Sequence, residues 1–88
     1  MLRAFVRFSI DGDDGSLTTS MRGLLEQCGF QRIGTGAYEH AAVRVQDLGA
    51  ALAEFWSAVS DPAAAFPTKS IPPGASFDHI WIYSGAVQ

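Results

Sequence analysis

Hydrophobic residues in this chain change their spacing along the sequence, and this change limits the folds that the chain can adopt. Apolar residues alternate with polar ones in residues 2–11, which is typical of a half-buried β-strand. In residues 77–84 both alternating sets are largely apolar, which predicts a strand that is covered on both faces. Between these stretches, apolar residues twice recur every three to four positions, as they do on the buried side of a helix. The first helical set is Leu17, Met21, Leu24, Leu25 and Cys28, and the second is Leu48, Ala51, Leu52, Phe55, Trp56 and Val59.

Two short strands are predicted between these helices, at residues 31–34 and 37–45. The Gly-Thr-Gly sequence at 34–36 favours a tight turn or a bulge between them. A turn at Glu39 and His40 fits the pattern equally well. The predicted order of elements is strand, helix, strand, strand, helix, strand.

Polar residues, glycine and proline mark the ends of the two helices. Asp14 or Ser16 can cap the first helix, and Gly29 fits a left-handed residue just after it. Asp47 is the predicted cap of the second helix. Pro62 ends that helix, because proline disfavours α geometry in the residue before it.

Residues 62–76 contain all four prolines of the chain and are predicted to form a long loop before the last strand. A loop of this length in a small domain is usually functional or disordered. Phe66 and Ile71 give it apolar side chains that can pack onto the domain or onto a partner.

The order of elements predicts an α+β fold of the ferredoxin-like class, formed by residues 1–88 as a single domain. Its four-stranded antiparallel sheet would carry both helices on one face, because right-handed crossovers place them on the same side. The other face would be solvated, covered by the proline-rich loop, or used for association. Aromatic residues expected outside the helices favour association. Among them, Phe5 lies on the polar side of the first strand, and Phe77, Trp81 and Tyr83 share one side of the last strand with His79.

Charge and cysteine content argue against several classes of protein. The net charge is −3 with six basic residues, whereas a nucleic-acid binder usually needs a basic patch to neutralise phosphates. Cys28 is the single cysteine, so neither an internal disulfide nor a cysteine-rich zinc site can form. No apolar run reaches the ~20 residues that span a bilayer. A cytoplasmic protein without membrane contacts is therefore predicted.

Asp11, Asp13 and Asp14 form an acidic cluster just after the first strand. Carboxylates this close together can hold Mg²⁺, which makes these residues candidates for catalysis and Asp11 the candidate metal ligand. The same Asp-Gly-Asp-Asp-Gly sequence is also typical of an ordinary strand-to-helix turn. An EF-hand is excluded, because the twelfth position counted from Asp11 is Arg22 and not glutamate.

The remaining reactive side chains have structural explanations. His40 and His79 lie on different predicted strands, so a shared site would need a dimer or a favourable register. Asp78 adjoins His79 but would point to the opposite face of its strand. Cys28 lies on the apolar side of the first helix and is predicted to be a core residue.

Several short segments are similar to those of a known superfamily. Phe8-Ser9-Ile10 precedes the acidic turn, the first helix closes on Gly29-Phe30, Arg32 to Glu39 follows, and the last strand contains Ile80-Trp81-Ile82-Tyr83. Together these segments resemble the small ferredoxin-like protein of the CRISPR spacer-acquisition complex and its relative, virulence-associated protein D.

The resemblance implies a homodimer and, as in some members, a metal-dependent nuclease. The aspartate assigned to the metal in that superfamily corresponds to Ser9 here, and a serine hydroxyl is a poor Mg²⁺ ligand. Asp11 lies two residues on and on the same strand face, so it could replace that aspartate only if the strand shifted.

Three functions follow from these observations. The first is a dimer-forming module that acts through protein contacts, without a cofactor or catalysis. The second is a metal-dependent nuclease or toxin that uses Mg²⁺ at Asp11 with Asp13 or Asp14. The third is a small-ligand sensor that binds at a helix–sheet cleft or a dimer seam. For the first, the predicted interface residues are Phe5, Arg7, Phe66, Trp81 and Tyr83.

Overall fold

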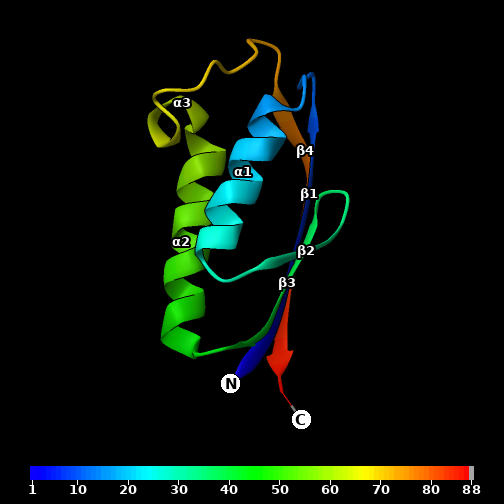
Figure 1. Cartoon of the computed structure of the whole chain (residues 1–88), viewed down its shortest axis with the longest axis vertical. Helices are drawn as coiled ribbons and strands as arrows, with labels where there is room; N and C mark the ends of the chain where they lie inside the picture. Colours follow the sequence, from blue (N-terminus) through cyan, green and yellow to red (C-terminus); the bar gives the residue numbers. More distant parts are fainter. Residues whose placement is uncertain (88) are drawn as a thin grey trace.

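The computed structural model of the chain describes residues 1–87. Its elements are β1 (Leu2–Asp11), α1 (Ser16–Gln27), β2 (Gln31–Gly34), β3 (Ala37–Val43), α2 (Val45–Ser60), α3 (Pro62–Ala65) and β4 (Ser76–Ala86). The prediction of an α+β fold with a four-stranded antiparallel sheet is therefore confirmed. Figure 1 shows the two long helices, α1 and α2, side by side on one side of the sheet. Within the described range, no helix has the length and apolar character needed to cross a membrane.

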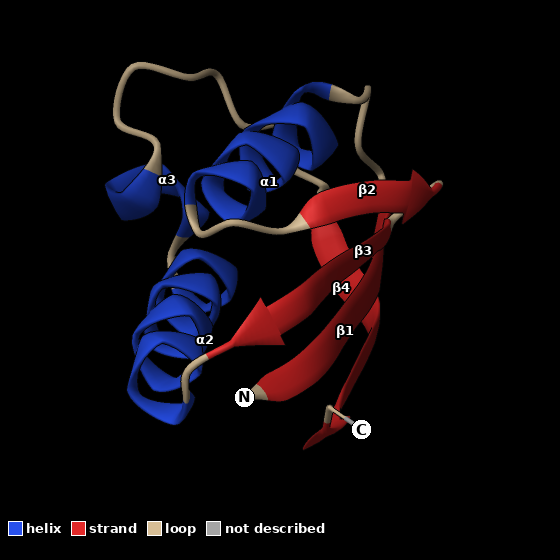
Figure 2. Ribbon diagram, turned by 60° about the horizontal axis from the view of Figure 1, so that its bottom comes forward, coloured by secondary structure: helices blue, strands red, loops and turns tan. Residues whose placement is uncertain are grey.

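The strands lie in the order β2-β3-β1-β4, and all neighbours are antiparallel. β4 accompanies β1 along its whole length, from Leu2 to Asp11. β3 reaches only as far as Arg7, which pairs with Ala37. Figure 2 shows β2 as the other edge strand, next to β3. β2 has four residues, and its pairing with β3 is irregular. The sheet is therefore uneven, with a long edge at β4 and a short one at β2.

Side chains between the sheet and the helices form one hydrophobic core. Phe8 lies near its centre, where its ring stacks on Tyr38 at 5.7 Å and meets Phe55 at 6.1 Å. The alternation along β1 accounts for this position, since every second residue points toward the helices. The buried residues are Ala4, Val6, Phe8, Leu17, Met21, Leu25, Phe30, Tyr38, Val43, Leu48, Ala51, Phe55 and Ala58.

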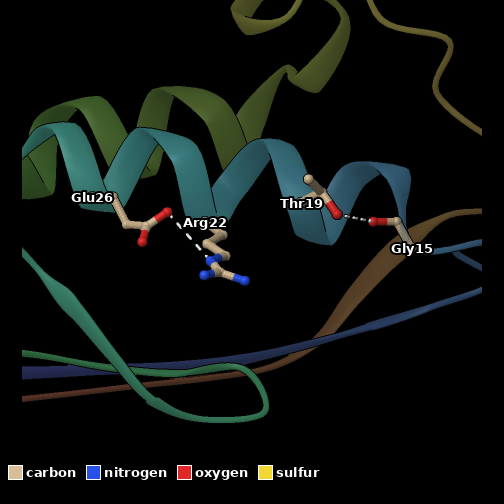
Figure 3. Close-up of polar contacts among 4 residues, drawn as sticks. All are labelled: Gly15, Thr19, Arg22 and Glu26. Atoms are coloured by element: carbon tan, nitrogen blue, oxygen red, sulfur yellow. Dashed lines mark hydrogen bonds and ion pairs between the residues drawn. The ribbon is translucent and has the colours of Figure 1, made fainter.

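α1 buries one side, as its period predicts, and keeps polar contacts on the other. Arg22 Nε donates a hydrogen bond to Glu26 Oε1 at 3.2 Å, and Thr19 Oγ1 donates to the Gly15 carbonyl at 2.8 Å (Figure 3). An exposed ion pair with this spacing stabilises a helix by about 0.3–0.5 kcal/mol. Most of the stability of α1 must therefore come from its buried side.

The predicted start of the second helix is wrong. α2 begins at Val45 with Arg44 as its cap residue, so Asp47 lies within the first turn. There the Asp47 carboxylate accepts a hydrogen bond from Arg44 Nε at 2.7 Å. A negative charge in the first turn of a helix also interacts favourably with the helix dipole. Asp47 thus supports the start of α2 without capping it.

The predicted loop at residues 62–76 contains a further helical turn, α3. Pro62 fits the first position of this turn, and Asp61 Oδ1 accepts a hydrogen bond from the Ala64 amide at 3.2 Å. Beyond α3, Phe66 and Ile71 pack against the core, so the loop is anchored to the domain itself.

β4 contains a bulge that changes the direction of its first side chains. Ser9 and Ile10 are neighbours in β1, yet they pair with His79 and Phe77, which leaves Asp78 as an extra residue. The prediction that Phe77 shares a face with the other aromatic residues of this strand is therefore wrong, since its ring packs against the core.

Candidate functional site

The face of the sheet opposite α1 and α2 is called the open face here. In the described part of the chain, no helix covers it (Figure 2). Its centre is formed by cross-strand pairs between β1 and β4. These pairs are Phe5 with Tyr83, Arg7 with Trp81, and Ser9 with His79.

Three rings on the open face form a continuous row, called the aromatic row: Phe5, Tyr83 and Trp81. The rings of Phe5 and Tyr83 lie 6.1 Å apart and are tilted, and those of Trp81 and Tyr83 lie 6.1 Å apart and are nearly parallel. Trp81 is 55% exposed and Tyr83 is 48% exposed. A patch of large exposed apolar side chains is typical of a binding surface.

Charged groups of both signs lie beside the aromatic row. Arg3 Nη2 donates to Glu39 Oε2 at 3.3 Å, and its guanidinium carbon lies 5.5 Å from the centre of the Phe5 ring. Arg7, one pleat further along β1, forms no ion pair with any residue between 1 and 87. The open face therefore carries one neutralised and one unneutralised arginine.

The bulge of β4 brings Asp78 onto the open face. Its Oδ1 accepts a hydrogen bond from the Ser9 hydroxyl, and this hydrogen bond is the main reason that the pKa of Asp78 is lowered. The prediction that Asp78 points away from the face of His79 is wrong, because a bulge sets two residues of one strand opposite a single residue of the other.

A hollow of about 630 Å³ lies at the edge of the sheet beside β1, where residues of the open face meet Thr18 of α1. The hollow forms because β3 begins only at Ala37, which pairs with Arg7. Beyond Arg7, as far as Asp11, β1 pairs with β4 but not with β3. The turn before β3 closes one side, where the Gly36 carbonyl accepts a hydrogen bond from the Phe8 amide at 2.9 Å. The residues that line the hollow are Arg7, Phe8, Ser9, Thr18, Thr35, Gly36, His79, Ile80 and Trp81.

Gly36 is required for this wall of the hollow. Its φ of 64° is in the left-handed region that glycine adopts readily, and an added Cβ would collide with the carbonyl oxygen of Phe8. The turn can therefore approach β1 closely only because residue 36 has no side chain.

Two of the predicted acidic residues hold the start of α1. Asp13 accepts hydrogen bonds from the Leu17 amide at 3.1 Å, the Thr18 amide at 2.9 Å and the Thr18 hydroxyl at 2.8 Å. Partial burial alone would raise the pKa of Asp13, but these hydrogen bonds outweigh it and the pKa is lowered. Asp14 accepts from the Ser16 amide at 3.0 Å, and hydrogen bonds from Ser16 lower its pKa as well.

Asp11 lies at the exposed end of β1, opposite Ser76. Among residues 1–87, no three or more His, Cys, Asp or Glu side chains are grouped so that they could hold a metal ion. The magnesium site stays a prediction with Asp11 as its candidate ligand, while Asp13 is occupied by amides of α1.

Other predicted residues lie on the helix side of the sheet. His40 pairs across from buried Ala4 and meets Phe30 edge-on at 5.5 Å, so it does not share a site with His79. Phe66 packs against the core and is not part of the aromatic row. The structure therefore brings together four of the five predicted interface residues and places Phe66 elsewhere.

Cys28 lies at the end of α1, partly buried against the core. Its Sγ donates to Glu54 Oε2 at 3.6 Å. Burial, followed by the negative charge of Glu54, raises the pKa of the Cys28 thiol. A thiol in these surroundings is a poor nucleophile, which agrees with its predicted role in packing.

Comparison with known proteins found no match, whether to a family model, a curated protein or a solved structure. The open face and the hollow beside β1 are therefore the features of this chain that point to a function. Two hollow residues, Thr35 and Thr18, were not singled out by the sequence, because they come from a turn and a helix that only the fold brings to the end of β1.

Proposed function

We propose that this chain is a ferredoxin-like module that forms a homodimer and acts through protein contacts. The ferredoxin-like class is supported by the order of elements and by an antiparallel sheet with the first and third strands at its centre. Both long helices on one side of the sheet agree with it (Figure 1). α3 adds one turn to the connection between α2 and β4.

The observation that carries the proposed dimer is the chemistry of the β4 edge. β4 has 11 residues, and its outer edge has no neighbouring strand in the described chain. Ile80–Ala86 contains neither a charged residue nor a proline, although these residues commonly protect exposed edges from pairing. Since Trp81 and Tyr83 are also about half exposed, this edge has the properties of a surface that is covered when the protein functions.

A second copy of the chain is the partner that fits this edge best. Antiparallel pairing of β4 with β4 of another copy is self-complementary about a two-fold axis. Because Ile80–Ala86 is uncharged, two chains of net charge −3 can meet there without like charges facing each other. Such pairing would extend the sheet and join the two aromatic rows.

Four of the predicted residues have a place in this dimer. Trp81 and Tyr83 would lie at the seam, with Phe5 behind Tyr83 and Arg7 behind Trp81 on the neighbouring strand. Phe66 has no part in it, because it packs on the helix side of the sheet.

Sedimentation equilibrium of three proteins at tens of micromolar tests the dimer. The variants are Tyr83→Lys and the control Trp56→Lys, which changes an aromatic side chain on α2. The two sites are matched in exposure, at 48% for Tyr83 and 47% for Trp56. We expect a dimer for the wild type and for Trp56→Lys. We expect a monomer for Tyr83→Lys, because a lysine on an edge strand opposes strand pairing.

Two outcomes would contradict the proposal. The first is a wild-type protein that sediments as a monomer, and the second is a Tyr83→Lys variant that remains a dimer. Far-UV circular dichroism of both variants would establish that loss of the dimer is not loss of the fold.

A further inference from the structure

We propose that the hollow beside β1, at the edge of the sheet, binds a small planar anion, an aromatic ring that carries a carboxylate or a phosphate. Its volume of about 630 Å³ lies within the range of roughly 300–1,000 Å³ that is usual for small-molecule sites. Every residue that lines it belongs to one chain, so this proposal does not rest on the proposed dimer.

Arg7 supplies the positive charge. Arg3, Arg22 and Arg44 each have a carboxylate partner within 3.3 Å. Arg7 lines the hollow, and no carboxylate of residues 1–87 neutralises it. A guanidinium binds carboxylate or phosphate oxygens through two parallel N–H groups, so it selects these two head groups over a neutral one.

Hydroxyl groups around the hollow show where the head group would lie. Ser9 donates its proton to Asp78, and Thr18 donates its proton to Asp13, so neither can donate to a ligand. Thr35 lines the same hollow and donates no side-chain hydrogen bond to any described residue. The charge of Asp78 beside Ser9 repels an anion at that end. The head group is therefore expected at Arg7 and Thr35.

Trp81 supplies a surface for a planar ring. Tyr83 stacks against one side of the indole at 6.1 Å and 10° and so holds its orientation. Trp81 lines the hollow together with His79, the residue two positions before it in β4. Because Trp81 and Arg7 are cross-strand neighbours, a ring stacked on the indole can place its acid group at the guanidinium.

The chain contains two tryptophans, so a Trp56→Phe protein reports on the hollow through the fluorescence of Trp81 alone. The probes are benzoate and phenyl phosphate, which carry both a ring and a charge, benzyl alcohol, which lacks the charge, and inorganic phosphate, which lacks the ring. We expect the two ring anions to change the emission of Trp81. Benzyl alcohol and inorganic phosphate should bind more weakly than the ring anions, by a factor of about ten or more. Comparison of benzoate with phenyl phosphate then identifies the preferred head group.

Arg7→Gln in the same background tests the charge, with Arg32→Gln on β2 as a control that changes the net charge equally. We expect Arg7→Gln to weaken binding of the better ring anion about tenfold or more, and Arg32→Gln to weaken it by less than about twofold. If Arg7→Gln does not fold, Thr35→Val is measured in its place, with an expected loss of about threefold.

Three results would overturn the site. The first is unchanged Trp81 emission with both ring anions at millimolar concentration. The second is equal binding of benzyl alcohol and benzoate. The third is an equal loss of affinity for the ring anion in Arg7→Gln and Arg32→Gln. None of them bears on the sedimentation experiment, so the site and the dimer can fail separately.

Discussion

The hydroxyl of Ser9 donates a hydrogen bond to the carboxylate of Asp78, the extra residue of the β4 bulge. This contact joins the irregular part of the edge strand to the central strand β1. It also lowers the pKa of Asp78. The ionised carboxylate therefore stabilises the folded chain above the ordinary aspartate pKa of about 3.9, and this stability is lost as the pH falls through the lower pKa of the folded state.

Ser9→Ala removes this hydrogen bond and should raise the pKa of Asp78 toward about 3.9. We expect the variant to be less stable than the wild type at neutral pH, with a difference that shrinks as the pH falls below about 4. An NMR titration of the carboxyl carbons measures the pKa directly. Asp14 is the internal control, because its pKa is lowered by Ser16 and should not change. An unchanged pKa of Asp78 in the variant would show that the hydrogen bond from Ser9 does not lower this pKa.

Asp13→Ala should lower the free energy of unfolding by about 0.5–2 kcal/mol, since the first amides of α1 lose their acceptor. Asp13→Asn should retain most of the stability, because an amide oxygen can accept the same hydrogen bonds. Urea denaturation of both variants measures the difference. Equal destabilisation by alanine and asparagine would mean that the negative charge matters more than the acceptor.

Phe55→Ala and Trp56→Ala compare neighbouring residues of α2 that differ in burial. Phe55 is fully buried against Phe8, whereas Trp56 is 47% exposed. We expect Phe55→Ala to cost about 3–5 kcal/mol of unfolding free energy, because the core loses a ring and is left with a cavity. Trp56→Ala should cost less than about 1 kcal/mol. Similar costs in chemical denaturation would contradict the position of the core.

Gly36→Ala and Gly49→Ala should change stability in opposite directions. At Gly36 a Cβ would meet the carbonyl of Phe8 at a left-handed φ, so we expect a loss of about 1–3 kcal/mol. At Gly49, inside α2, a Cβ has open space, and alanine should add about 0.5–1 kcal/mol. Thermal unfolding measures both. A stabilising Gly36→Ala would mean that the turn beside the hollow lies further from β1.

The magnesium hypothesis and the dimer-forming module predict different outcomes with nucleic acids. The magnesium hypothesis predicts cleavage of RNA or DNA that depends on Mg²⁺ and on Asp11, whereas the dimer-forming module predicts no cleavage. The measurement is incubation with labelled RNA and DNA, with and without Mg²⁺, of the wild type and Asp11→Ala. Cleavage that needs Mg²⁺ and disappears in Asp11→Ala would favour the nuclease over the dimer-forming module.

Periodicity predicted much of this fold. The alternation of residues 2–11 placed Phe8 toward the helices and Phe5 on the other face, and the helical spacing of Leu17, Met21 and Leu25 identified the buried side of α1. These predictions were correct because each depends on the geometry of a single element.

Features that depend on two elements were missed. A bulge is defined only by the pairing of two strands. The hydrophobic alternation of either strand alone therefore did not indicate that Phe77 points toward the core or that Ser9 contacts Asp78. The hollow likewise arises because β3 is shorter than β1, and their lengths matter only once these strands are neighbours.

The short edge strand at the other side of the sheet limits how large an assembly could grow. Two copies joined through β4 would present only β2 at their outer margins, a strand of four residues that carries Arg32 and pairs irregularly with β3. Such a margin is a poor template for further strands. Growth would stop at a closed pair, and a fibre of stacked chains would have no long strand on which to extend.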